Sequence, residues 1–176
     1  MLKKLINEIL DGVIILNVVL VEPRIPQNTG NIARTCAVTG SSLHLVKPLG
    51  FSLDDRYLKR AGLDYWDDLD IKVHESFDDF LKKHKNDKLF LFSTKAAKTY
   101  SEEKFTGDEY LIFGKETAGL PESFIKDNLP SSLRIPMRDY ARSLNLANSV
   151  AIVLYEAYRQ LDFPGFQKKG KFMQEF

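Results

Sequence analysis

The feature of this sequence that most constrains its fold is a regular alternation of short apolar runs with helix-like segments. The apolar runs are rich in β-branched and aromatic residues, as strands buried on both faces of a sheet are. They occupy residues 13–21, 42–46, 71–73, 89–92, 111–113 and 133–137. Strands that alternate with helices form a largely parallel sheet with helices on both faces. The sequence therefore predicts an α/β fold.

Helical patterns fill the intervals between these runs. The sequence predicts helices at residues 1–11, 28–39, 54–61, 77–84 and 147–161. Asn28 is a good N-cap, and Gly40 is placed to end the helix that Asn28 begins. Gly30 in its first turn leaves space for another surface to approach the backbone. The apolar stripe of the last helix indicates either core packing or a subunit interface.

The length of 176 residues indicates a single domain. We expect this domain to span residues 16–165, after an extension of residues 1–15 and before a polar tail of residues 166–176. A content of 44% hydrophobic and 28% charged residues is typical of soluble globular proteins. The apolar residues 12–21 are too few to span a bilayer, and no signal-peptide cleavage site follows them. The single cysteine, Cys36, excludes an internal disulfide and fits a reducing compartment, so we expect a cytoplasmic protein with no membrane segment.

The net charge and the histidine residues do not identify a binding partner. His44, His74 and His84 lack the spacing of metal ligands, so we expect no metal site. An RNA-binding chain with a net charge of +1 must gather its basic residues on one face. Residues 58–66 mix basic side chains with two aromatic ones, which suits phosphate contact and base stacking. A helix with one buried aromatic residue explains the same pattern equally well.

Two loops near the C-terminus, residues 114–121 and 142–149, have the composition of a ligand pocket. Ligands of open α/β sheets bind beyond the carboxyl ends of the strands, where both loops are expected. A phosphate-binding loop is not indicated, because Gly114-Lys115 is followed by Glu116 rather than by serine or threonine, and no G-x-G-x-x-G is present. Ordinary strand-to-helix turns share these features. The apolar side chains that suit a flat heteroaromatic ligand are Leu120, Ile135, Met137 and Leu144.

Three motifs of this chain resemble those of one enzyme superfamily. The first is Asn-x-Gly-x-x-x-Arg, from Asn28 to Arg34, and the second is Phe-Gly-Lys-Glu-Thr-Ala-Gly-Leu-Pro at residues 113–121. Arg-Ile-Pro-Met and Arg-Ser-Leu-Asn-Leu-Ala-Asn-Ser-Val follow at residues 134–137 and 142–150. In this order they resemble the SPOUT superfamily of RNA methyltransferases, over about residues 16–165. The nearest resemblance is to the minimal subfamily that methylates the ribose 2′-hydroxyl of the wobble nucleotide in tRNA.

The resemblance implies a fold, a reaction and a set of residues. The fold would contain a C-terminal trefoil knot, and the protein would be a homodimer that uses S-adenosylmethionine to methylate cytidine or uridine in the tRNA anticodon stem-loop. The implied cofactor-binding residues are Phe92, Gly114, Ile135, Met137, Ser143 and Leu144, with Gly114 leaving room for the adenosine. The implied catalytic residues are Arg34, Glu116 and Asn145. The implied substrate-binding residues are Asn28, Arg60 and Tyr155. The superfamily normally begins near residue 16, so residues 1–15 depart from it.

Elementary chemistry limits what Arg34 can do. A general base would need its guanidinium pKa lowered from above 12 to near 7, which costs at least about 7 kcal/mol. We therefore expect a cationic arginine that holds a phosphate or stabilises a developing alkoxide. A solvated charge on a helix is the alternative for Arg34, and simple helix packing is the alternative for Tyr155.

Other functions stay open at this point. The substrate could be another nucleotide of tRNA, or ribosomal RNA, although larger relatives that act on ribosomal RNA carry an added RNA-binding domain for which this chain has no room. The chain could also be a non-catalytic RNA-binding module with the same fold. The intact first motif, from Asn28 to Arg34, argues against a non-catalytic module, which need not keep a catalytic arginine.

Overall fold

The computed structural model describes residues 14–53 and 69–170. Two predicted helices, at residues 1–11 and 54–61, lie outside the described residues. So do Arg60, one of the candidate substrate-binding residues, and the aromatic residues Tyr65 and Trp66.

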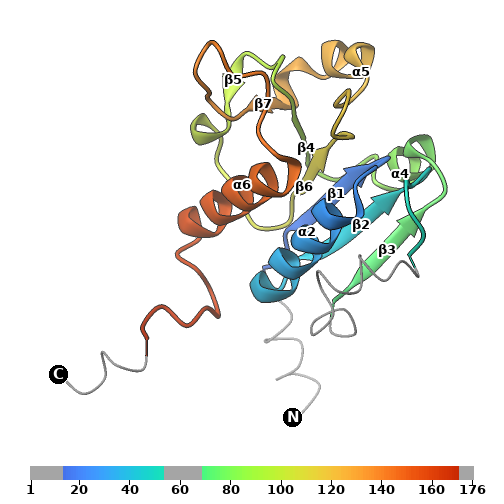
Figure 1. Cartoon of the computed structure of the whole chain (residues 1–176). Coiled ribbons are helices and arrows are strands. Elements are labelled where there is room, and N and C mark those ends of the chain that lie inside the picture. The colour runs from blue at the N-terminus through green and yellow to red at the C-terminus, as the bar shows by residue number, and fades with distance from the viewer. Residues whose placement is uncertain (1–13, 54–68, 171–176) are drawn as a thin grey trace.

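The described residues contain one seven-stranded sheet in which every pair of neighbouring strands is parallel (Figure 1). The order across the sheet is β3-β2-β1-β6-β4-β7-β5. The strands are β1 (Asn17–Val21), β2 (Ser42–Val46), β3 (Ile71–His74), β4 (Leu89–Phe92), β5 (Lys98–Thr99), β6 (Tyr110–Phe113) and β7 (Ser132–Arg134). The predicted parallel sheet is confirmed. Only β5 was not predicted, because its two residues are polar and form no apolar run.

Helices cover both faces of the sheet (Figure 1). They are α2 (Pro26–Thr39), α4 (Phe77–Lys83), α5 (Glu122–Asp127) and α6 (Leu146–Gln160), with short 3-10 turns η1 (Tyr100–Glu102) and η2 (Leu129–Ser131). Helices α2 and α6 pack against each other on one face, and α4 and α5 cover the other. Val18 and Leu20 belong to the first core and Val19 and Val21 to the second, since successive strand side chains point to opposite faces.

The boundaries of two predicted strands were wrong. Strand β1 begins at Asn17 rather than at residue 13, because only Asn17–Val21 align with partners in β2. Strand β7 ends at Arg134 rather than at residue 137. Pro136, which has no N–H to donate, follows two residues later. Ile135 and Met137, which lie beyond the strand, instead line a cavity.

The beginning of α2 also differs from the prediction. The helix starts at Pro26 with Ile25 as its N-cap, so Asn28 lies inside the first turn and is not the cap. Proline favours the first helical position because its φ angle is already helical and no N–H is lost there. The predicted helix end is confirmed, with Gly40 in the left-handed region at φ 69°. No helix among residues 14–53 and 69–170 is long and apolar enough to cross a membrane.

Candidate functional site

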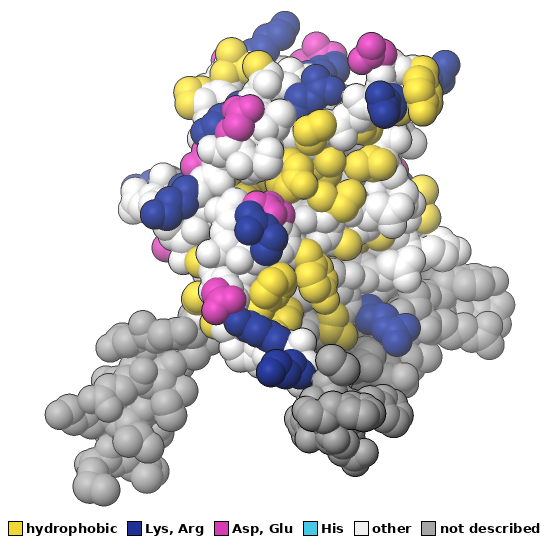
Figure 2. All heavy atoms as spheres, turned by 90° about the vertical axis from the view of Figure 1, so that its left-hand side faces the viewer, with side chains coloured by type: hydrophobic (Ala, Val, Ile, Leu, Met, Phe, Trp, Pro, Cys, Tyr) yellow, Lys and Arg dark blue, Asp and Glu magenta, His cyan; other side chains and the backbone are white. Residues whose placement is uncertain are grey.

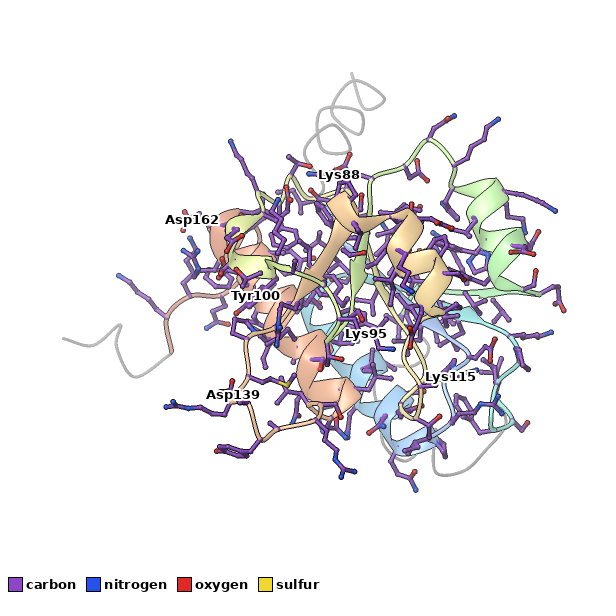
Figure 3. The ribbon with its side chains drawn as sticks, turned by 90° about the horizontal axis from the view of Figure 1, so that it is seen from above. Lys88, Lys95, Tyr100, Lys115, Asp139 and Asp162 are labelled. Carbon is purple, nitrogen blue, oxygen red and sulfur yellow. The ribbon has the colours of Figure 1, made fainter. Side chains whose placement is uncertain are left out.

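A cavity of about 580 Å³ opens where the carboxyl ends of β4, β6 and β7 meet. This volume is typical of small-molecule sites. Figure 3, seen from above the view of Figure 1, labels Lys95, Lys115 and Asp139, each on the loop that follows one of these strands. All six predicted cofactor-binding residues line the cavity, namely Phe92, Gly114, Ile135, Met137, Ser143 and Leu144. Their role as cofactor ligands stays a prediction, while their common location is a finding.

Apolar and polar side chains share the lining of the cavity. The rings of Phe92 and Phe113, at the ends of adjacent strands, stack with centroids 4.7 Å apart. Ile135, Met137 and Leu144 come from the segment between β7 and α6. A flat heteroaromatic group can bury its faces against such side chains, and the hydroxyl and amide groups at the rim can hydrogen-bond its edge. Sequence reasoning assigned no role to several lining residues, including Ile25, Arg142 and Ser149.

Gly114 is required by the fold of its own loop. The backbone N–H of Gly119 donates to the carbonyl of Lys115 at 2.8 Å, so residues 115–119 close a tight turn. A Cβ atom at position 114 would lie 2.1 Å from the carbonyl carbon of Gly119 and 2.2 Å from the backbone nitrogen of Leu120. We predicted that Gly114 leaves room for an adenosine, but the atoms that exclude a side chain there belong to the protein itself.

A hydrogen-bond bridge joins the three sequence motifs at the rim of the cavity. The Glu116 carboxylate accepts hydrogen bonds from the backbone N–H groups of Arg24 (2.9 Å) and Ile25 (3.1 Å), and from Nδ2 of Asn28 (3.1 Å). Oδ1 of Asn28 accepts a hydrogen bond from Nδ2 of Asn145 at 2.9 Å. We call Glu116, Asn28 and Asn145 the motif bridge. It holds the start of α2 against both loops of the cavity.

The motif bridge occupies much of the polar capacity of its members. Oδ1 of Asn145 also caps α6, accepting from the backbone N–H groups of Ala147 (2.9 Å) and Asn148 (3.3 Å). Asn28 is 7% exposed, and both ends of its side-chain amide have protein partners. The geometry gives these three residues a positioning role. Their predicted catalytic and substrate-binding roles stay predictions.

Arg34 and Tyr155 lie outside the cavity lining. Arg34 is exposed on α2, and Tyr155 is 45% exposed on α6. Asn28 and Arg34 are six residues apart, which at about 100° per residue places them about 120° apart around the helix axis. The motif bridge directs Asn28 to the cavity, so Arg34 faces another side of the helix.

The three histidines, which are scattered in sequence, come together between β2, β3 and the end of α4. The described part of the chain offers this group as a possible metal site, with ligand atoms within 4.8 Å of one another. Two features weigh against a metal. Nδ1 of His44 and Nε2 of His74 are hydrogen bonded to each other at 3.0 Å, with rings 11° from parallel. The 4.8 Å span also exceeds the roughly 3.4 Å between ligands around a tetrahedral zinc ion. The expectation of no metal site stays a prediction.

Burial dominates the electrostatics of this histidine pair. His44 is fully buried and His74 is 5% exposed. The pKa of His44 is lowered to about 3, mainly by desolvation and then by the positive charge of Lys72 and of the neighbouring imidazoles. The pKa of His74 is also lowered, again mainly by burial. Both imidazoles are therefore neutral at physiological pH.

Comparison with known proteins places this geometry in context. Residues 15–155 match the model of the SpoU rRNA Methylase family. A tRNA (cytidine(34)-2′-O)-methyltransferase of Yersinia pestis is 51% identical over 157 residues, which cover 85% of this chain and 96% of that protein. A solved structure from work on the 2-OH methylation of C/U34 on tRNA is 46% identical, with a TM-score of 0.78 over 84% of this chain and 97% of that chain.

A third relative was solved with its cofactor. The AdoMet-bound rRNA methyltransferase of Sinorhizobium meliloti is 26% identical to this chain, with a TM-score of 0.75 over 84% of this chain and 57% of that chain.

Proposed function

Because this chain belongs to the SpoU rRNA methylase family, we propose that it transfers a methyl group from S-adenosylmethionine to the ribose 2′-hydroxyl of the wobble nucleotide of tRNA, cytidine or uridine 34. The observation that carries this proposal is the 51% identity to the Yersinia pestis enzyme over nearly the whole of that protein. We further propose that the protein acts in the cytoplasm, where its substrate would be found.

The cavity fits S-adenosylmethionine in size and in chemistry. It combines apolar walls with short polar groups, and the related Sinorhizobium meliloti enzyme was solved with this cofactor bound. We propose that Ile135, Met137 and Leu144 pack against the adenine ring and that Phe92, Gly114 and Ser143 bind the rest of the molecule. The cofactor supplies an electrophilic methyl carbon. The protein must hold that carbon in line with the ribose oxygen, which is a matter of positioning.

The ribose hydroxyl loses its proton during transfer, and negative charge develops on its oxygen. A cationic Arg34 suits stabilisation of that charge or contact with a flanking phosphate. Arg34 is not among the residues that line the cavity of its own chain, and it lies about 120° around α2 from Asn28, which does line it. We propose a homodimer in which α2 of one protomer presents Arg34 to the cavity of its partner.

Surface composition supports this dimer. Val38 on α2 and Ile152 and Tyr155 on α6 are exposed apolar side chains on two helices that pack side by side. Figure 2 shows apolar side chains gathered over the middle of the face toward which α6 lies, with basic and acidic side chains around them. Such a patch is more typical of a protein interface than of a solvated helix pair.

Methylation of defined RNA tests the proposed function. The purified chain would be incubated with S-adenosylmethionine and anticodon stem-loops carrying cytidine, uridine or a 2′-deoxynucleotide at position 34. We expect nucleoside mass spectrometry to detect 2′-O-methylcytidine or 2′-O-methyluridine, and no product from the 2′-deoxy substrate. Methylation at position 34 of the 2′-deoxy RNA would show that the base is the acceptor. Methylation elsewhere in tRNA, or only in ribosomal RNA, would replace the substrate assignment.

A further inference from the structure

Tyr140 is the most exposed large apolar side chain of the described residues, at 88%. It lies between β7 and α6, within a turn closed by a hydrogen bond from the backbone N–H of Ala141 to the carbonyl of Arg138 at 2.9 Å. Burying a large aromatic side chain stabilises a fold by about 1.5–3 kcal/mol, and Tyr140 contributes none of this within the chain. Its position in an ordered turn is therefore not explained by packing.

The surroundings of Tyr140 have the composition of a single-stranded RNA site. Arg138 and Arg142 are both exposed and flank the tyrosine at two residues on either side, against one acidic residue, Asp139. Aromatic faces that stack on bases, interleaved with arginines that contact phosphates, are the usual means of binding unpaired nucleotides. A protein partner would be expected to need a contiguous apolar patch, and the neighbours of Tyr140 within the turn are charged or small.

The turn adjoins the cavity. Met137 on one side of it and Arg142 on the other both line the cavity. Two residues span at most about 7 Å, so Tyr140 stands within that reach of the Arg142 backbone at the rim. An RNA strand bound at the rim beside Arg142 would therefore lie within reach of Tyr140.

We propose that Tyr140 stacks on a nucleobase adjacent to the methylated nucleotide, with Arg138 and Arg142 contacting the flanking phosphates. This inference rests on the proposed function and adds to it a residue that orients the RNA. Stacking on the base next to the target fixes the register of the strand. It thereby determines which ribose reaches the methyl group.

Steady-state kinetics on an anticodon stem-loop test the proposal at saturating S-adenosylmethionine. Removing a base-stacking aromatic costs about 5- to 150-fold in RNA affinity, so we expect Tyr140→Ala to raise the KM for RNA by this factor. Tyr140→Phe keeps the ring and should retain the parent KM. Tyr140→Leu keeps apolar volume without a π face and should resemble Tyr140→Ala. The Kd for S-adenosylhomocysteine should be unchanged in all three.

Abasic RNA locates the contact. In a stem-loop that lacks the base on the 5′ or the 3′ side of the target, the parent chain should lose the stacking contact in one of the two. Tyr140→Ala and the parent chain should bind that RNA with equal affinity. The other abasic RNA should still bind the parent more tightly than Tyr140→Ala. An Arg138→Gln variant should bind every RNA more weakly by a similar factor. The slope of its log Kd against log salt concentration should be smaller than that of the parent by about one.

The outcomes separate this proposal from the proposed function. If the parent methylates the RNA and Tyr140→Ala has the parent KM, the stacking role is wrong and the proposed function stands. Equal losses in Tyr140→Phe and Tyr140→Ala would also refute stacking. If the parent transfers no methyl group to any RNA, the proposed function fails. RNA affinity measured by fluorescence anisotropy then tests the stacking role of Tyr140 independently of methyl transfer. Parent-like RNA affinity in Tyr140→Ala would overturn the stacking role.

Discussion

Mild acid should destabilise this protein through the buried histidine pair. His44 has a pKa of about 3 in the folded chain and an ordinary value of 6.5 when unfolded. Between these values the unfolded state binds a proton that the folded state does not, so stability rises with pH and falls as the pH is lowered from 6.5. Lowering the pH from 7 to 5 should therefore reduce the free energy of unfolding by about 2 kcal/mol from His44 alone. His74, whose pKa is also lowered, adds to the loss.

The pH window isolates histidines from carboxylates. The pKa of Glu109 is lowered in the folded chain: burial raises it, but hydrogen bonds from the hydroxyl and N–H of Thr106 and the N–H of Gly107 outweigh that effect. Its stabilisation is present above the unfolded value of 4.5 and is lost below it, as the pH falls towards the folded pKa. Between pH 7 and 5 the histidines therefore dominate the change. Urea denaturation at fixed protein concentration measures it.

His44→Asn is the matched variant. Its side-chain nitrogen can replace Nδ1 of His44 in the hydrogen bond to His74, while the titrating group is removed. We expect the variant to be less stable than the parent at pH 7, because it fills less of the core. Its loss between pH 7 and 5 should be smaller than that of the parent by about 2 kcal/mol. Equal losses in the two chains would refute the assignment of the acid sensitivity to His44.

Three further predictions concern the site. Arg34→Ala should lower the rate of methyl transfer by about a hundred- to a thousandfold and leave the Kd for S-adenosylhomocysteine unchanged. Arg34→Lys keeps the positive charge but not the planar guanidinium, so its rate should separate an electrostatic role from bidentate hydrogen bonding. A parent-like rate in Arg34→Ala would show that Arg34 takes no part in the reaction. Gly114→Ala should be less stable than the parent by about 1–3 kcal/mol, because backbone atoms occupy the place of its Cβ. Calorimetry should show that it has lost most of its affinity for S-adenosylhomocysteine. Gly170→Ala, whose Cβ meets nothing within 4 Å, is its control. Light scattering should show a dimer, and a monomer at micromolar concentration would contradict the shared site. Mixing Arg34→Ala chains with Gly114→Ala chains should restore some activity that neither variant has alone.

The sequence predicted the framework of the fold because that framework is set by local patterns. Runs such as Leu89–Phe92 and Ser42–Val46 carry a β signal within a few residues, and the structure places both strands as expected. Strand β5 was missed because Lys98–Thr99 has no such signal and pairs only through its neighbour β7. The histidine cluster was missed for a related reason. Its members are 30 and 10 residues apart along the chain, and only the parallel pairing of β2 with β3 brings His44 beside His74.

The sequence predicted which residues belong to the candidate site but not how they are arranged in it. The six residues expected to bind the cofactor do share one cavity, because the sheet brings the ends of β4, β6 and β7 together. Sequence could not show which of them face a ligand and which support the loops. Gly114 illustrates the difference, since its role in closing a turn depends on the position of Gly119 in three dimensions.

The motif bridge explains why three separate motifs act as one unit. Glu116 and Asn28 are 88 residues apart, Asn28 and Asn145 are 117 apart, and each hydrogen bond joins α2 to a different loop. Because Asn28 lies in the first turn of α2, the bridge fixes both the place and the rotation of that helix. The rotation determines where Arg34 points, six residues or nearly two turns further along. We therefore propose that Glu116 and Asn145 act on catalysis through position, by setting the direction in which α2 presents Arg34.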